Sequence, residues 1–218
     1  MQTSQRSDSA FSWPLFSRTP LIGILRHVPQ DILEQIIPIY LDAGLTTLEV
    51  TMNSEGVEDM IRYVRQHYPT QLIVGAGTVC NQDDLQRALD AGAQFIVTPI
   101  INRDVIKACV NVGIPIFPGA YTPTEIYEAW SLGATMVKVF PATSLGPDFI
   151  KDVKAPFSQI KLMPTGGVSL DNIGQFLWAG ADGLGVGSQL FDKKMIKNKD
   201  WDALRRHFDS YVKALRDR

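Results

Sequence analysis

Short apolar runs and helix-like segments alternate along most of the chain. In five places a helix-like segment ends at glycine, and an apolar run closed by turn residues follows it within a few positions. Glycine suits the C-terminal cap of a helix, and an apolar run without polar alternation suits a parallel strand that is covered on both faces. The five segments read D-A-G-L-T-T-L-E-V-T, D-A-G-A-Q-F-I-V-T-P, N-V-G-I-P-I-F-P-G, S-L-G-A-T-M-V-K-V-F-P and W-A-G-A-D-G-L-G-V-G-S.

Three further apolar runs bring the number of expected strands to eight. Consecutive runs lie about 20 to 26 residues apart, which is the length of one strand–helix unit. Between them lie helical patterns such as 31–43 and 83–91, which begin with acidic residues, as the helix dipole favours. The expected strands lie near residues 21–26, 47–52, 72–76, 95–98, 114–118, 135–140, 160–164 and 183–186.

Eight such units without a break in composition predict a single α/β domain, a (β/α)8 TIM barrel over residues 20–218. A doubly wound sheet is the main alternative. That fold usually has a glycine-rich turn after its first strand, but here Arg26-His27-Val28-Pro29 stands at this position. We therefore expect the barrel.

Residues 1–19 are expected to form a short N-terminal extension, of which residues 1–10 are a disordered lead-in. The aromatic side chains of Phe11, Trp13 and Phe16 follow the lead-in and can plug one end of the barrel. The alternative interpretation is a tail without a structural role.

Composition agrees with one soluble domain. Of the 218 residues, 45% are hydrophobic and 20% are charged, and the net charge of −2 comes from interspersed acids and bases. Nothing in this balance indicates a nucleic-acid or membrane surface, although a small anion site stays open. The two cysteines favour a reducing compartment over a disulfide scaffold, and the chain shows no secretory signal and no membrane-spanning run. We expect a cytoplasmic protein.

Two charged residues interrupt the apolar strands. Lys138 lies between Val137 and Val139, and Glu49 lies between Leu48 and Val50. Because successive side chains of a strand point to opposite faces, both charges are expected inside the barrel, and Lys138 shares its face with Met136 and Phe140. Burial favours the neutral amine, which is the nucleophile of Schiff-base chemistry, and a nearby carboxylate can pass protons. The alternative is a buried ion pair without chemistry.

Other candidates stand where strands end, which is the active-site rim of this architecture. Glycines in P-T-G-G-V and G-V-G-S follow strands seven and eight, where a phosphate commonly binds; tight turns are the alternative. The planar guanidinium of Arg26, after the first strand, can hold a carboxylate, or it can be a solvated surface group. The rim candidates are Arg26, Thr78, Pro99, Phe140, Thr165, Gly166, Gly167 and Ser188.

No metal cluster is expected. His27, His67 and His207 are scattered, and the chain contains neither H-x-x-H nor C-x-x-C. The pattern favours covalent amine catalysis over metal-assisted carbon–carbon cleavage, without a cofactor.

Taken together, these motifs resemble the bacterial KDPG/KHG aldolases, which include the 2-keto-3-deoxy-6-phosphogluconate and 2-keto-3-deoxy-6-phosphogalactonate aldolases. The resemblance covers roughly residues 20–192. It rests on L-E-V-T around Glu49, G-A-G-T-V around Thr78, V-T-P around Pro99, K-V-F-P-A around Lys138, P-T-G-G-V around Gly166 and G-S at Ser188.

The resemblance implies a class I, metal-independent aldolase that is usually a homotrimer and releases pyruvate and D-glyceraldehyde 3-phosphate from a phosphorylated 2-keto-3-deoxy sugar acid. It implies that Lys138 forms the Schiff base and that Glu49 is the general acid and base. Thr78 and Pro99 would line the pyruvyl end and Phe140 would pack beside the Schiff base. Thr165 would contact the substrate, and the terminal phosphate would lie against Gly166, Gly167 and Ser188.

One position departs from the pattern. The phosphogluconate branch carries an arginine four residues after the catalytic glutamate, and here Asn53 stands there. Arg26, in G-I-L-R, resembles the phosphogalactonate branch and is inferred to contact the substrate carboxylate from another strand. The preference between the two C4 epimers therefore stays open.

Three alternatives remain at this point. The first is the same chemistry on unphosphorylated 4-hydroxy-2-oxoglutarate. The second is a phosphate-binding barrel isomerase or epimerase that uses Glu49 and Lys138 only as acid and base. The third is a non-catalytic sensor of phosphorylated sugars, which leaves the inward lysine unexplained.

Overall fold

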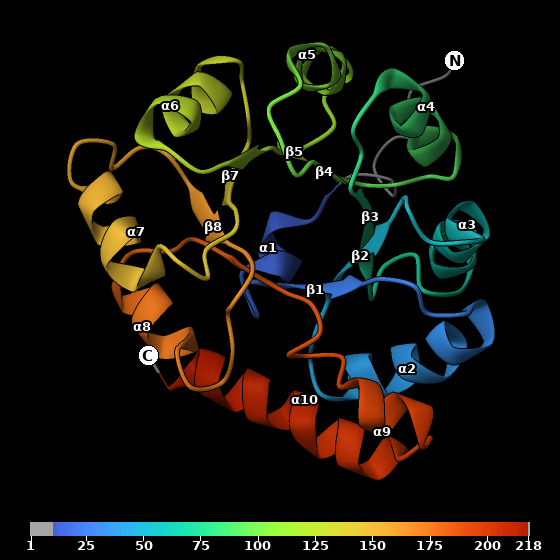
Figure 1. The fold of residues 1–218 in the computed structure, drawn as a ribbon. Coiled ribbons are helices and arrows are strands. Elements are labelled where there is room, and N and C mark those ends of the chain that lie inside the picture. Colours follow the sequence, from blue (N-terminus) through green and yellow to red (C-terminus); the bar gives the residue numbers. More distant parts are fainter. Residues whose placement is uncertain (1–10, 218) are drawn as a thin grey trace.

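The structure is a computed structural model that describes residues 11–217. Residues 1–10, the expected lead-in of the N-terminal extension 1–19, lie outside the described residues. In the described part, strands and helices alternate along the chain, as the apolar pattern predicts. The fold is α/β (Figure 1).

The strands of residues 11–217 are all parallel and form two sheets. They are β1 (Leu21–Leu25), β2 (Thr47–Thr51), β3 (Ile73–Gly77), β4 (Ile96–Val97), β5 (Ile116–Phe117), β6 (Gly119–Ala120), β7 (Val137–Val139), β8 (Leu162–Pro164) and β9 (Leu184–Val186). One sheet has the order β5-β4-β3-β2-β1-β9 and the other the order β6-β7-β8. Each of the eight expected runs overlaps a strand, and the ninth strand, β6, lies directly after the expected run 114–118.

The two sheets follow each other in one curled arrangement. Thr165, directly after β8, forms a parallel bridge to Gly185 of β9. On the other side, β5 and β6 are separated only by Pro118, which has no amide hydrogen to donate and so interrupts the ladder within the expected run 114–118. The result is a curled parallel sheet with helices around its outside (Figure 1).

Local sequence sets the ends of the helices. The helices of the described part are α1 (Trp13–Phe16), α2 (Gln30–Asp42), α3 (Val57–His67), α4 (Gln82–Asp90), α5 (Arg103–Val112), α6 (Pro123–Ser131), α7 (Gly146–Lys154), α8 (Ile173–Trp178), α9 (Lys193–Lys197) and α10 (Trp201–Arg216). Thr122 and Glu125 form a capping box at the start of α6. The expected glycines at helix ends all have positive φ, namely Gly44, Gly92, Gly113, Gly133 and Gly180. None of the helices in residues 11–217 is long and apolar enough to cross a membrane.

The core has an outer and an inner layer, and β7 shows how the strands divide them. Val137 and Val139 pack in the large outer cluster with the helices, whereas Met136 belongs to a smaller inner cluster. Phe11 and Phe16 join that inner cluster, and the ring of Phe11 lies 5.6 Å from the ring of Phe95. The segment containing α1 therefore packs inside the curled sheet (Figure 1), as expected for a plug. Two buried charged residues, Glu49 of β2 and Lys138 of β7, also lie on these strands.

Candidate active site

Glu49 and Lys138 are buried on the inner face of the sheet. Glu49 is the middle residue of β2, in register with Ile24 of β1 and Gly75 of β3, and it is fully buried. Lys138 is the middle residue of β7 and is 4% exposed. Both side chains therefore lie where strand alternation places them.

The Glu49 carboxylate has no hydrogen-bond partner among the described residues, at either oxygen. Burial raises the pKa of Glu49, and the positive charges of Lys138 and Arg26 lower that pKa in part. A carboxylate in such surroundings takes up and releases a proton more readily near neutral pH than an exposed one does. Its free lone pairs leave it available to a ligand or a water molecule.

The surroundings of Lys138 shift its pKa in the direction opposite to that of Glu49. Burial lowers its pKa, Glu49 opposes that shift, and the charge of Arg26 adds to it. Its Nζ lies 4.8 Å from the centre of the Phe140 ring. A lysine with a lowered pKa has a larger neutral fraction, and the neutral amine is the form that attacks a carbonyl carbon.

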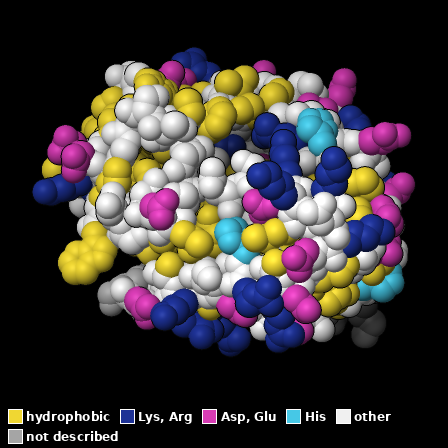
Figure 2. Space-filling view, turned by 60° about the horizontal axis from the view of Figure 1, so that its bottom comes forward, with side chains coloured by type: hydrophobic (Ala, Val, Ile, Leu, Met, Phe, Trp, Pro, Cys, Tyr) yellow, Lys and Arg dark blue, Asp and Glu magenta, His cyan; other side chains and the backbone are white. Residues whose placement is uncertain are grey.

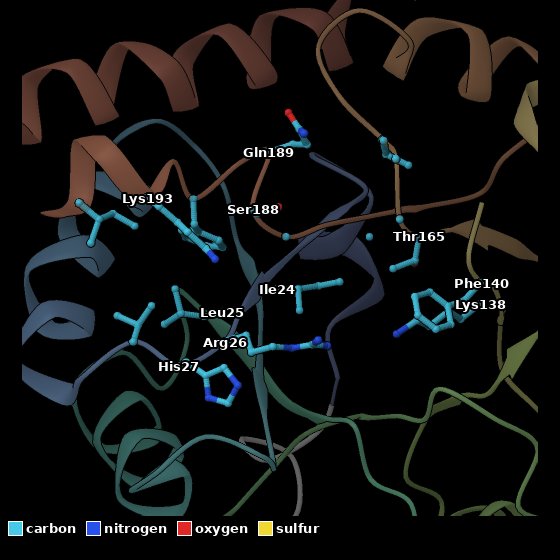
Figure 3. Close-up of a pocket in the computed structure, with 18 of the residues that line it drawn as sticks. Ile24, Leu25, Arg26, His27, Lys138, Phe140, Thr165, Ser188, Gln189 and Lys193 are labelled. Atoms are coloured by element: carbon cyan, nitrogen blue, oxygen red, sulfur yellow. The ribbon is translucent and has the colours of Figure 1, made fainter. Parts of the chain in front are cut away.

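A cavity of about 620 Å³ opens at Lys138, whereas Glu49 is not among the described residues that line it. Its lining unites seven of the predicted residues, Arg26, Lys138, Phe140, Thr165, Gly166, Gly167 and Ser188. In Figure 3, Arg26 and Lys138 extend toward each other from opposite sides of this cavity. Asn53, by contrast, is exposed and does not line it. Arg26 is thus the arginine available to the cavity from the first strand.

The glycine-rich end of the cavity is a tight turn with a fixed conformation. Gly166 and Gly167 have φ of 87° and 78°, and a Cβ on Gly167 would lie 2.9 Å from the Cα of Thr143. Asn172 donates from Nδ2 to the Gly167 carbonyl at 2.8 Å. The glycines are therefore required by the turn itself, and the same turn brings backbone to the wall of the cavity.

Thr78 and Pro99 lie apart from the lining of this cavity. Thr78 follows β3 with φ of 56°, a strained conformation for a β-branched residue. Pro99 lines a second cavity of about 540 Å³, which shares Phe140 with the first. Thr78 lines neither of these two cavities, so the structure separates Thr78 and Pro99 from the other predicted rim residues.

Three basic residues of the cavity lining were not identified from the sequence. His27 lines the cavity with φ of 53°, and Lys193 and Lys197 of α9 line it as well. The four-residue spacing of the two lysines, shortly after G-V-G-S, was an available signal. Residues 11–217 contain no group of three His, Cys, Asp or Glu side chains placed to share a metal ion.

Comparison with known proteins identifies the family. Residues 15–207 match the profile of the KDPG and KHG aldolases. The chain belongs to this family. The prediction from the motifs is confirmed, and the protein is an aldolase, a carbon–carbon lyase.

Its relatives include both branches of the family. The chain is 36% identical over 176 residues to the 2-dehydro-3-deoxy-6-phosphogalactonate aldolase of Escherichia coli strain K12, covering 80% of this chain and 86% of the relative. It is 37% identical over 189 residues to the 2-dehydro-3-deoxy-phosphogluconate aldolase of Haemophilus influenzae, covering 85% and 89%. Overall identity therefore does not separate the branches.

Solved structures share the fold. A structure described as native KDPGal superimposes with a TM-score of 0.84 at 34% identity, over 91% of this aldolase and 95% of that chain. The KDPG aldolase of Legionella pneumophila, with pyruvate captured as a covalent carbinolamine, gives 0.83 at 25% identity over 90% and 96%. These relatives support the interpretation of the chain as a class I aldolase.

Proposed function

We propose that this aldolase cleaves 2-keto-3-deoxy-6-phosphogluconate, its C4 epimer 2-keto-3-deoxy-6-phosphogalactonate, or both, to pyruvate and D-glyceraldehyde 3-phosphate. The observation that carries the proposal is a pair of buried groups with oppositely shifted pKa values, Glu49 and Lys138, of which Lys138 lines a cavity together with Arg26. The names of the relatives in both branches support the substrate class.

In the proposed mechanism, the neutral amine of Lys138 adds to the C2 ketone, and loss of water gives an iminium. The electron pair of the C3–C4 bond moves into the iminium while the C4 hydroxyl gives its proton to Glu49 through a water molecule. This step releases D-glyceraldehyde 3-phosphate and leaves an enamine. Glu49 returns the proton to C3, and water hydrolyses the iminium to pyruvate and the free amine.

The remaining predicted residues hold the two ends of the substrate. Arg26 would contact the carboxylate, since its guanidinium extends into the cavity toward Lys138 (Figure 3). Gly166, Gly167 and Ser188 would hold the phosphate, and Thr165 would contact the substrate between the two ends. Thr78, Pro99 and Phe140 would surround the pyruvyl group.

The preference between the two C4 epimers is tested in a separate experiment. Cleavage of the two C4-epimeric phosphorylated substrates is compared at equal enzyme concentration. With Asn53 outside the cavity and Arg26 inside it, we expect the phosphogalactonate epimer to be cleaved with the higher kcat/KM. A higher value for the gluconate epimer would reject this preference.

The covalent step is tested by trapping. The protein is incubated with pyruvate, reduced with borohydride, and mapped by mass spectrometry. The expected result is a reduced pyruvate adduct on Lys138 that is absent in Lys138→Ala. Lys161→Ala is the matched control, because Lys161 lies over the ring of Trp13 and does not line the cavity. A protein that binds phosphorylated sugar acids but stays unmodified would favour an isomerase or a sensor.

We further propose that the two sheets close into one (β/α)8 barrel over residues 20–218, preceded by the extension 1–19. The bridge between Thr165 and Gly185 and the short step across Pro118 support closure. The resemblance to the family supports a homotrimer, which light scattering would measure. It supports a cytoplasmic location too, as do the free thiols of Cys80 and Cys109.

A further inference from the structure

The lining of the main cavity is strongly cationic. It contains Arg26, His27, Lys138, Lys193 and Lys197, and no Asp or Glu is among the described residues that line it. The charges of Arg26, Lys193 and Lys197 face one cavity and add their potentials, so the cavity attracts anions more strongly than any one of these groups does. The proposed function assigns Lys138 to catalysis and Arg26 to the substrate carboxylate. It assigns no role to the two lysines of α9.

The position of α9 over the cavity is fixed by its flanking residues. The Gly187 carbonyl accepts hydrogen bonds from the amides of Leu190 and Phe191, at 2.9 and 3.0 Å, so the chain folds back directly after β9. Asp192 then caps α9, and its Oδ1 accepts from the amides of Lys194 and Met195, both at 2.8 Å. This short segment joins Ser188, at the wall of the cavity, to the lysines.

Lys193 and Lys197 project from one face of α9. Residues four apart on a helix are neighbours, and Ile196 between them lines the cavity as well. Figure 3 shows Lys193 reaching toward the cavity from the side of Ser188. Lys194, on the same helix, is exposed and does not line the cavity.

Neither ammonium is neutralised by the rest of the described chain. Within residues 11–217, the ion pairs involve other lysines and arginines, and no carboxylate lies within ion-pairing distance of Lys193 or Lys197. The nearest acid in sequence, Asp192, uses its carboxylate for the helix cap. Two unpaired cations at the mouth of a cavity without acids are suited to a dianionic group.

We propose that Lys193 and Lys197 form a phosphate clamp that selects phosphorylated over unphosphorylated substrates. The clamp faces the terminal phosphate from α9, while the backbone of the Gly166–Gly167 turn and the hydroxyl of Ser188 contact it from the cavity wall. This inference rests on the proposed function and adds specificity-determining residues to it.

The effect of the clamp is expected in KM. An ion pair at an exposed site contributes modestly, so each lysine is expected to lower the KM of a phosphorylated substrate about threefold, and both together roughly tenfold. The phosphate takes no part in the bond changes, so the clamp binds the ground state and the transition state equally, and kcat is expected to change less than about twofold. Screening by salt weakens the same attraction.

The experiment compares Lys193→Ala/Lys197→Ala with the control Lys194→Ala. For each protein, kcat and KM are measured with a phosphorylated 2-keto-3-deoxy acid and with its unphosphorylated analogue, at low and high salt. The clamp predicts a roughly tenfold rise in KM for the phosphorylated substrate alone, a weaker salt dependence, and no such change in the control. An unchanged ratio of kcat/KM between the two substrates would overturn it.

Two further measurements keep this test separate from folding and from the proposed function. If the double alanine variant does not fold, Lys193→Gln/Lys197→Gln replaces it. If pyruvate is not trapped on wild-type Lys138, the aldolase mechanism fails, and the clamp is still tested by titrating inorganic phosphate calorimetrically. Weaker phosphate binding in the double variant than in Lys194→Ala supports the clamp, and equal binding rejects it.

Discussion

The carboxylate of Glu49 lies directly against the Cα of Gly77, and a Cβ built on residue 77 would overlap Oε1 of Glu49. Gly77 is the last residue of β3 and pairs with Thr51, two residues after Glu49 on the neighbouring strand. Contact of this kind fixes the carboxylate by shape rather than by a hydrogen bond. Both oxygens of Glu49 are then left for substrate or water.

Gly77→Ala is therefore expected to displace Glu49 while the backbone stays intact. Misplacement of a catalytic group by about 1 Å can cost on the order of 100-fold in rate, and we expect a loss of kcat of that size. Pyruvate trapping on Lys138 is expected to persist, because the amine is untouched. Gly174→Ala in α8 is the control, since nothing lies within 4 Å of a Cβ there. Equal kcat in the two variants would contradict the steric role of Gly77.

Strand periodicity predicted the faces of the strands but not the shape of the rim. Glu49 and Lys138 lie inside the sheet because side chains alternate along a strand, and that is a local property. Thr78 and Pro99 lie outside the main cavity, and Phe140, directly after β7, lines both that cavity and the one at Pro99. Local patterns carry no information about such contacts between loops.

The helix α9 illustrates the same limit. Its five residues are too few for a recognisable helical period, and its approach to the cavity follows from the turn at Gly187 and the cap at Asp192. The break between β5 and β6 at Pro118 was readable from the absent amide hydrogen of proline. The bridge between Thr165 and Gly185 could not be predicted from the sequence.

Replacement of both buried charges is expected to stabilise the fold and abolish activity. Both charged groups lose hydration on burial, and neither oxygen of Glu49 has a hydrogen-bond partner among the described residues, so Glu49→Met/Lys138→Met should have a higher free energy of unfolding in urea. The exposed pair Asp59–Arg62 is the control, where a double alanine variant should change stability by less than about 1 kcal/mol. A less stable Met variant would contradict the cost assigned to these charges.

The stability gain depends on pH with a sign that the pKa shifts determine. The folded-state pKa of Glu49 lies above the ordinary value of 4.5, so its contribution to stability is present below pH 4.5 and is lost as pH rises through the folded pKa. The folded-state pKa of Lys138 lies below 10.5, so Lys138 costs stability below its folded pKa, and the cost disappears as pH rises toward 10.5. The part of the advantage that comes from replacing Glu49 should therefore be larger at pH 7 than below about pH 4.5, whereas the part that comes from replacing Lys138 is largest at acidic pH.

Arg26 is expected to set the pH dependence of imine formation. Its charge lowers the pKa of Lys138, so in Arg26→Gln that pKa rises, and the rate of pyruvate trapping should move to higher pH. Arg26→Lys keeps the charge and should keep the wild-type profile. If Arg26→Gln weakens pyruvate binding without moving the profile, Arg26 acts only as a carboxylate contact. If Arg26→Gln changes neither pyruvate binding nor the pH profile, Arg26 has no role in the site.

His27 holds a strained backbone beside the cavity, and His27→Gly is expected to stabilise the protein. The residue has φ of 53°, and its amide donates to Oγ of Ser54 at 2.9 Å, which ties the loop after β1 to the loop after β2. Glycine adopts positive φ without the steric cost of about 1–2 kcal/mol, but it loses more entropy on folding, so a net gain of about 0.5–1 kcal/mol remains. His67→Gly, at the end of α3, is the matched control and should be slightly destabilising because glycine is a poor helix former. Urea unfolding of the two variants measures this difference, and a loss of stability in His27→Gly would mean that contacts of the imidazole outweigh the strain.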